Sequence, residues 1–383
     1  MNPSFDVIIV GAGIVGAACA AECARAGLKV LVLDRGPVGG GTTGAGMGHL
    51  VVMDDSEAQF ALTHYSRRLW NNLAPQLPKA IEYDQCGTLW VAADEQEMAE
   101  VRRKASFYTQ RGVRVEVLDA NAVAAAEPNL RPGLVGGLRV VRDAVLYPPC
   151  AARCLIELSQ AQKAQLRTGA VVAALLPEGG AVLADGSRFF AGAVVNAAGP
   201  WSPALHPGLP VRKRKGHLAV TERYPGYIHH QIVELGYLKS AHSVGTDSVA
   251  FNVQPRKTGQ VLIGSSRQYA AEGTEINTPI LQRMLHRALE YMPGLGRLAV
   301  TRCWTGHRPA TPDKLPLIGP TPNNAKIWLA TGHEGLGITT CLGTGKLLAD
   351  LLLERPPEIP AEPYAPARLL RATKPKPLQC ATT

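Results

Sequence analysis

Three glycines near the start of the chain have the spacing that binds a pyrophosphate. Gly11, Gly13 and Gly16 form a Gly-x-Gly-x-x-Gly segment between the apolar run 5–10 and an alanine-rich, helix-like stretch. The first glycine permits a tight strand-to-helix turn, the second lets the backbone approach a pyrophosphate, and the third lets the helix pack on the strands. Free amides at the helix start then face the phosphates. We therefore predict dinucleotide binding.

A carboxylate and a glycine-rich loop extend this site. Asp34 ends the second apolar run, where an acid accepts hydrogen bonds from both ribose hydroxyls and repels a 2′-phosphate. Residues 36–49 are rich in glycine and include Thr42 and Thr43. Such a loop can wrap a cofactor closely, with hydroxyls for phosphate or ribityl oxygens, at a cost in backbone entropy. A surface loop without a ligand is the alternative.

The sequence Ile327–Ala330 starts a second strand, glycine turn and helix, which continues to Leu353. The start of a helix carries partial positive charge. Reduced flavin is negative around N1 and the C2 carbonyl, so a second helix start suits a flavin, whereas a nicotinamide cofactor does not need one. A flavin is therefore favoured over NAD.

Arg308 is the predicted substrate ligand. It ends a predicted strand and precedes Pro309. A guanidinium held in that position can grip a carboxylate through two parallel hydrogen bonds. The alternative is a structural arginine paired with Asp313.

Composition restricts the class of protein. The 383 residues are long enough for two domains, and 19% charged with 46% hydrophobic residues is ordinary for a globular protein. The net charge of +9 is scattered without a basic–aromatic stripe, which favours solvated faces or an acidic partner or substrate over nucleic acid. Eight cysteines without a CxxC pair predict neither a disulfide framework nor a metal or iron–sulfur site. We expect no secretory signal, no membrane-spanning helix and a cytoplasmic location.

The predicted fold is α/β (α+β overall), a Rossmann-like FAD-binding domain of the glutathione-reductase type with an inserted substrate domain. Two-fold alternation of apolar residues from 211 to 263 indicates a mixed or antiparallel sheet there. The predicted segments are 1–50, 145–210 and 300–353 for FAD, 51–144 and 211–299 for substrate, and 354–383 as an extended Pro/Lys-rich tail. For the tail, disorder and an arm on a partner subunit are both open. Ser56, Asp94 and Asp119 are predicted helix caps.

The chain resembles the FAD-dependent D-amino-acid oxidase superfamily, in its glycine oxidase and sarcosine oxidase branch, over residues 3 to about 353. The resemblance rests on Gly11–Gly16 with Asp34-Arg35, Asn196–Ser202, Gly306–Asp313 and Gly335–Thr340. The Gly-x-Arg-Pro-x-Thr-Pro-Asp and His-Glu-Gly-Leu-Gly-Ile-Thr-Thr segments are its most specific parts. The loop 45–55 is most similar to flavin β subunits of bacterial complexes acting on D-hydroxyproline or opines, or turning glycine into cyanide.

This resemblance implies roles for individual residues. Arg308 would bind the substrate carboxylate, and Val172 would hold the adenine through its backbone. His49 and His333 are possible aids to substrate deprotonation, with plain packing as the alternative for each. The residues placed on FAD are Gly11, Gly13, Ile14, Val15, Gly16, Asp34, Arg35, Thr42, Thr43, Gly46, Met47, Gly48, Val172, Ala198, Gly199, Trp201, Arg308, Gly335, Leu336, Gly337, Ile338 and Thr339.

Two departures from the family pattern matter. Covalently flavinylated relatives carry a cysteine where this chain has Gly306, so we predict non-covalent FAD. Glycine oxidase relatives also use a tyrosine from the inserted sheet, and its counterpart between Lys239 and Asn252 is not assigned.

Three functions follow from the resemblance. The first is the catalytic FAD subunit of a dehydrogenase that oxidises the Cα–N bond of a small D- or secondary amino acid, D-hydroxyproline first, by hydride transfer to flavin N5. Its electrons would leave through partner subunits with further redox centres. The second is a self-sufficient oxidase of the glycine or sarcosine type that makes peroxide. The third is a non-catalytic flavin subunit that relays electrons.

Overall fold

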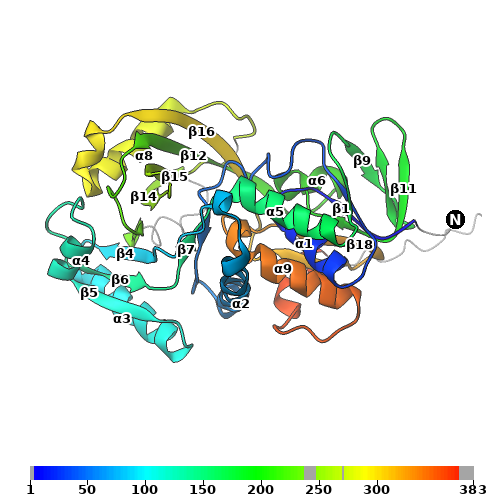
Figure 1. Cartoon of the computed structure of the whole chain (residues 1–383), viewed down its shortest axis with the longest axis horizontal. Helices are drawn as coiled ribbons and strands as arrows, with labels where there is room; N and C mark the ends of the chain where they lie inside the picture. The colour runs from blue at the N-terminus through cyan, green and yellow to red at the C-terminus, as the bar shows by residue number, and fades with distance from the viewer. Residues whose placement is uncertain (1–3, 237–246, 270, 371–383) are drawn as a thin grey trace, which may run out of the picture.

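Two eight-stranded sheets form the two halves of the protein (Figure 1). The computed structural model describes residues 4–236, 247–269 and 271–370. The predicted α/β class is confirmed, with one sheet that begins as parallel strands and a second, mixed sheet. Within the described residues, no helix is both long and apolar enough to cross a bilayer.

The first sheet begins with the parallel pair β1 (Phe5–Val10) and β2 (Val30–Leu33). Its strands are buried on both faces, as expected for a parallel sheet covered by helices. The remaining strands are β8 (Gln165–Arg167), β9 (Val172–Leu175), β10 (Gly180–Leu183), β11 (Arg188–Asn196), β17 (Leu317–Thr321) and β18 (Asn324–Thr331). The main path runs β17-β18-β11-β1-β2-β8, and the β9–β10 hairpin continues from β11.

Three helices pack together beside this sheet, and α1 (Ile14–Arg25) contacts the other two, α5 (Pro148–Ala161) and α9 (Gly337–Leu352). The short helix α6 (Ser202–Leu205) follows β11. Alanines 17, 18, 20 and 24 keep α1 narrow enough for close contact, and all four are buried. The carboxyl ends of β1 and β11 and the starts of α1 and α9 therefore meet in one region, where a ligand of an open parallel sheet is expected.

The second sheet runs β16-β12-β15-β14-β13-β4-β6-β5. This sheet is mixed. Strands β13 and β4 run parallel, and all the other pairs of neighbouring strands in the sheet are antiparallel. Its strands are β4 (Thr88–Ala92), β5 (Val115–Asp119), β6 (Gly136–Val140), β12 (Arg212–Arg223), β13 (Gln231–Glu234), β14 (Ser248–Pro255), β15 (Gln260–Arg267) and β16 (Val300–Ala310). Among the described residues of this half, the α-helices are α3 (Glu95–Gln110), α4 (Ala120–Ala126) and α8 (Thr278–Tyr291), and α8 packs on β14 and β15.

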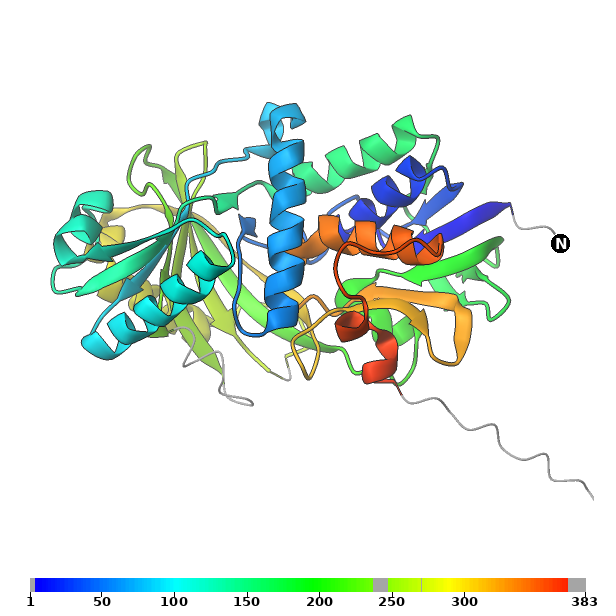
Figure 2. The ribbon, with the colours of Figure 1, turned by 90° about the horizontal axis from the view of Figure 1, so that it is seen from below.

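Helix α2 (Glu57–Leu73) stands between the two halves and contacts α9 (Figure 2). The two-stranded pair β3 (His49–Leu50) and β7 (Ala144–Val145) also joins segments that are distant in the sequence. The predicted caps are confirmed, because the side chains of Ser56, Asp94 and Asp119 each accept a hydrogen bond from the backbone of the third residue after them.

The structure differs from the sequence prediction at residue 300. Residues 300–310 form β16, which pairs with β12 from Arg212↔Ala310 to Thr221↔Val300 and therefore belongs to the second sheet. The first sheet resumes only at Leu317, in β17. Strand membership follows from long-range pairing, which the local pattern of residues 300–310 did not reveal.

The prediction of an extended tail that buries nothing was wrong for residues 354–370. Tyr364 in the short 3₁₀ turn Glu362–Tyr364 is fully buried, and its hydroxyl donates to the Ala58 carbonyl at 2.6 Å. Arg368 pairs with Asp313 at 2.6 Å. One buried aromatic ring and two ion pairs, Arg368–Asp313 and the exposed Arg68–Glu358, hold this proline-rich segment in place despite its composition. Residues 371–383 lie outside the described residues.

Candidate active site

The early glycines form a turn that has no room for side chains. Gly11 has φ +116°, and a Cβ there would lie 2.5 Å from the Ala197 carbonyl oxygen. A Cβ on Gly16 would lie 1.9 Å from the Gly11 oxygen, so the first turn of α1 packs directly on the β1 turn. A Cβ on Gly13 would have Thr43 Oγ1 as its nearest neighbour, at 3.3 Å. We call this turn, residues 11–16, the glycine cradle. Its exposed backbone amides can lie close to a pyrophosphate.

Asp34 lies at the edge of the cradle and is fixed by two amides. One carboxylate oxygen accepts from Ala12 N at 2.5 Å and the other from Gly36 N at 2.7 Å. Arg35 lies over the Trp201 ring with its guanidinium carbon 4.2 Å from the ring centroid. The side chains of Asp34, Arg35 and Trp201 all line one cavity. The predicted contact between Asp34 and a ribose requires Asp34 to lie there.

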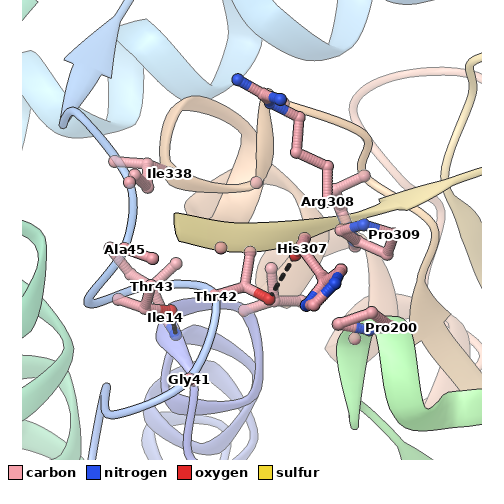
Figure 3. Close-up of a pocket in the computed structure, with 18 of the residues that line it drawn as sticks. Ile14, Gly41, Thr42, Thr43, Ala45, Pro200, His307, Arg308, Pro309 and Ile338 are labelled. Atoms are coloured by element: carbon pink, nitrogen blue, oxygen red, sulfur yellow. Dashed lines mark hydrogen bonds between the residues drawn. The ribbon is translucent and has the colours of Figure 1, made fainter. Parts of the chain in front are cut away.

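The glycine-rich loop ties the two halves together. Thr43 Oγ1 accepts from Ile14 N at 2.9 Å and so occupies one of the first amides of α1. Thr42 Oγ1 donates to the His307 carbonyl at 2.7 Å, as Figure 3 shows. These hydroxyls therefore hold the loop against α1 and β16, a use that the sequence prediction did not include.

One cavity of about 670 Å³ joins the cradle, the start of α9 and the inner face of the second sheet. Most of the predicted cofactor residues line it, together with His49, His333 and Arg308. The lining residues among them are Gly11, Gly13, Ile14, Val15, Asp34, Arg35, Thr42, Thr43, Gly46, Met47, Val172, Ala198, Gly199, Trp201, Arg308, Gly335, Leu336, Gly337 and Ile338.

Three predicted cofactor residues lie outside the cavity wall and have structural roles instead. Gly16 supports the turn described above. Gly48 has φ +109°, and a Cβ there would lie 1.9 Å from the Leu146 oxygen. The Thr339 hydroxyl donates to the His49 carbonyl at 2.9 Å and accepts from Val51 N at 3.3 Å, which fixes β3 against α9.

The late turn places the start of α9 at the cavity. Gly335 to Ile338 line the wall, and α9 begins at Gly337. The carbonyls of Ile338 and Thr339 both lie within reach of Trp70 Nε1, at 3.3 and 3.2 Å. Two helix starts therefore face one cavity, and the positive ends of both suit an electron-rich ligand.

Arg308 projects from β16, and Figure 3 shows its side chain extending away from Ile14 and Thr42. Its Nη1 donates to the Ser266 carbonyl at 2.9 Å. It crosses β12 at Gly216, where a Cβ would meet Nη1 at 2.4 Å. The structural alternative, a pair with Asp313, is wrong, because Asp313 binds Arg368 instead.

His49 and His333 are both neutral at ordinary pH but lie in different surroundings. Burial, together with the neighbouring Arg308 charge, lowers the pKa of His49 to about 4. Its Nδ1 is buried and has no hydrogen-bond partner within the described part of the chain. Burial lowers the pKa of His333 to about 3, and its Nε2 lies 3.0 Å from Thr344 Oγ1. His49 also interacts with the Gly335 backbone, whereas His333 Nε2 is held by Thr344 of α9.

Sequence reasoning missed a group of polar residues on the second sheet. Two arginines, one glutamine, one asparagine and one tryptophan line the cavity there, each at least nine-tenths buried: Arg214, Arg267, Gln231, Asn252 and Trp90. A signal existed, because the alternation that puts Leu218 on one face of β12 puts Gly216 and Arg214 on the same face. The other four residues, on β4, β13, β14 and β15, reach the same cavity only because of the register between the strands, which the sequence did not reveal.

Comparison with known proteins agrees with this geometry. Residues 6–351 match the model of the FAD dependent oxidoreductase (DAO) family. The chain belongs to this family. It is similar to a D-amino acid dehydrogenase of Methylobacterium nodulans, with 30% identity over 96% of this chain and 99% of the relative. The hydrogen cyanide synthase subunit HcnC of Pseudomonas aeruginosa is 25% identical over 96% of this chain and 97% of its own length. The glycine oxidase structure from Geobacillus kaustophilus has a TM-score of 0.85 at 26% identity, covering 97% of this chain and 99% of that one.

Membership of the DAO family makes the chain an FAD-dependent oxidoreductase. The residues present fit FAD, because the side-chain-free turn, the Asp34 carboxylate and the second helix start lie along one continuous cavity. Gly306 faces Ala45, and a Cβ on Gly306 would lie 2.4 Å from the alanine Cβ. A cysteine in that position would need the loop to move, which supports the predicted non-covalent FAD.

Proposed function

We propose that this protein oxidises the Cα–N bond of a small D- or secondary amino acid. D-hydroxyproline is the first monocarboxylate to test. The observation that carries the proposal is the position of Arg308 in the cavity that also holds the glycine cradle and the start of α9. A guanidinium is the side chain best shaped to fix a carboxylate by two bonds, and it thereby sets the position of the adjacent Cα.

When bound, FAD supplies the acceptor for the hydride that leaves Cα. The amine must be neutral for this step, because its lone pair forms the C=N bond as the hydride departs. The imine product takes up water and gives a keto acid and an amine, or remains as a cyclic imine. Arg308 holds the carboxylate, and the remaining amine proton passes to solvent.

His49 orients the amine in this proposal. Its side chain lines the cavity, and a neutral imidazole there can accept a hydrogen bond from the substrate N–H. With a pKa of about 4 it accepts this bond without keeping the proton at neutral pH. His333 is held by Thr344, and we assign it to packing.

We further propose that the protein works as the flavin subunit of a larger dehydrogenase. The similarity to HcnC, which is named as a subunit, supports this reading. The similarity to glycine oxidase supports the other candidate, a self-sufficient oxidase that reduces oxygen to peroxide.

Anaerobic mixing of the FAD-loaded protein with D-hydroxyproline, sarcosine or glycine tests the proposal. Bleaching of the flavin absorbance near 450 nm supports amine oxidation, and no bleaching by any amine would refute it. Repeating the reaction in air separates the two candidates. Fast reduction with little peroxide identifies a dehydrogenase, and peroxide formed at the rate of reduction identifies an oxidase.

A further inference from the structure

We propose that Ser266 and His217 position Arg308 for the substrate, through an extra residue near the end of β15 that turns the Ser266 carbonyl towards the guanidinium. Neither Ser266 nor His217 is among the residues that line the cavity in the described part of the chain. Both act through Arg308 and are therefore positioning residues. Their role rests on the proposed function, in which Arg308 holds the substrate carboxylate.

Beside the cavity, β15 carries one more residue than the neighbouring strand β12. Ala219 of β12 pairs with Ile263 of β15, and Lys215 forms an isolated bridge with Gln268. The first strand covers this interval in four steps and the second in five. The extra residue makes a β-bulge, which interrupts the ladder and re-aims the groups beside it. Residues 264–267 therefore need contacts to β12 other than regular pairing.

The Ser266 hydroxyl supplies such a contact. Ser266 Oγ accepts from the His217 backbone amide at 2.8 Å and lies 2.9 Å from His217 Nδ1. The Ser266 carbonyl accepts from Arg308 Nη1 at 2.9 Å. One residue is thus fixed to β12 by its side chain and to the guanidinium by its backbone. Without the hydroxyl, the His217 amide and ring lose their common acceptor, and the Ser266 carbonyl can turn away from Arg308.

The contacts of His217 determine its tautomer. Its Nε2 lies 3.0 Å from the backbone nitrogen of Asn277, the residue that caps α8. A backbone N–H can only donate, so Nε2 accepts and the ring proton is on Nδ1. Nδ1–H then donates to Ser266 Oγ. Burial, together with the Lys215 and Arg308 charges, lowers the pKa of the fully buried His217, which favours this neutral form.

Ser266→Ala removes the hydroxyl and leaves the chain otherwise intact. In anaerobic flavin reduction by the best amine, we expect the half-saturating amine concentration to rise at least tenfold while the limiting rate changes less than threefold. An unchanged half-saturating concentration would overturn the proposal. Ser159→Ala is the matched control and should behave as wild type, because Ser159 is a buried serine of α5 that donates to the Ile156 carbonyl and lies outside the cavity wall.

Two variants of His217 separate the functions of its two nitrogens. The side-chain amide of His217→Asn can donate from near the Nδ1 position to Ser266, whereas the longer side chain of His217→Gln places its amide near the Nε2 position. We expect His217→Asn to keep the half-saturating amine concentration within threefold of wild type and His217→Gln to raise it at least fivefold. Equal values for the two variants, or the reverse order, would refute the contact with Ser266 as the basis of the effect.

A double-variant comparison shows whether Ser266 acts through Arg308. Methoxyacetate is the probe, because this carboxylate has no C–N bond to oxidise, and its Kd is measured from the change in the flavin spectrum of the FAD-loaded protein. We expect Ser266→Ala to raise this Kd at least tenfold in the wild-type background and less than twofold in the Arg308→Ala background, since residues that act as one unit are not additive. An equal increase in both backgrounds would mean a general structural role and would refute the proposal.

The same assay keeps this role separate from the proposed function. If Ser266→Ala weakens methoxyacetate binding as expected but no amine bleaches the flavin, the proposed function fails and the positioning role stands. If amines bleach the flavin but Ser266→Ala binds methoxyacetate as tightly as wild type does, the positioning role alone fails.

Discussion

The two sheets present different kinds of chemical group to the cavity. The first sheet presents bare backbone: at Gly11 and Gly16 a Cβ would lie 2.5 and 1.9 Å from a carbonyl oxygen. The second sheet presents long charged side chains from neighbouring strands, with Arg214 and Arg308 facing each other across β12 and β16. A backbone site depends on the absence of side chains, and a side-chain site depends on their identity. Substitutions in the first should therefore abolish cofactor binding, whereas substitutions in the second should change substrate affinity and leave the flavin in place.

The largest expected effect follows from Gly16→Ala. The new methyl group would overlap the Gly11 carbonyl oxygen, whose distance from the ideal Cβ is 1.9 Å, and would push α1 off the turn. We expect the purified protein to lose nearly all of its FAD, measured as the ratio of absorbance at 450 and 280 nm.

Gly13→Ala is the milder form, since its Cβ would lie 3.3 Å from Thr43 Oγ1, and it should keep part of the FAD. Gly296→Ala is the control, because its nearest neighbour would be Leu289 Cδ2 at 3.4 Å. Wild-type FAD content in Gly16→Ala would contradict the backbone account of this site.

Arg308→Ala should have the next largest effect, and it should fall on the substrate alone. Losing charge-assisted hydrogen bonds to the carboxylate should raise KM about 100-fold. FAD content should stay at the wild-type level. Steady-state kinetics with the best amine from the anaerobic assay measure this change.

Gly216→Ala should give a smaller increase in KM in the same direction, because its methyl group would displace the Arg308 guanidinium from its position 2.4 Å away. Arg302→Gln is the control, because Arg302 is an exposed arginine of β16 outside the cavity wall. Loss of FAD from Arg308→Ala with unchanged KM would break the division between the two sheets.

The smallest expected effect is a pH dependence of stability. His333 has a pKa of about 3 in the folded protein and about 6.5 when unfolded. Between these values the unfolded chain binds more protons, so the free energy of unfolding should fall as the pH is lowered from about 6.5 towards 3. His333→Gln, which can keep a polar atom near Thr344, should reduce the slope of Tm against pH in that range.

His286→Gln is the matched control, because the His286 side chain is 78% exposed. The control should keep the wild-type slope, and part of that slope should remain in His333→Gln because His49 has a similarly lowered pKa of about 4. An unchanged slope in His333→Gln would contradict a neutral, buried His333.

The sequence by itself determined what is local along the chain. The Gly-x-Gly-x-x-Gly turn, the caps at Ser56, Asp94 and Asp119, and the glycine turn before α9 each depend on residues a few positions apart. Hydrogen bonds at a helix start join a residue to its third or fourth neighbour, so their signals can be read in order.

The tertiary structure alone decided the substrate end. Arg214, Gln231, Asn252, Arg267 and Arg308 come from five different strands, and they meet only because the register of the second sheet places them at one cavity. A shift of one residue in any of these strands would turn its side chain to the opposite face. Long-range strand pairing also decides that β16 belongs to the second sheet. Burial of Tyr364 holds the proline-rich segment 354–370 against the rest of the protein. Such contacts gain their free energy from burial between distant segments, which no local stretch of sequence records.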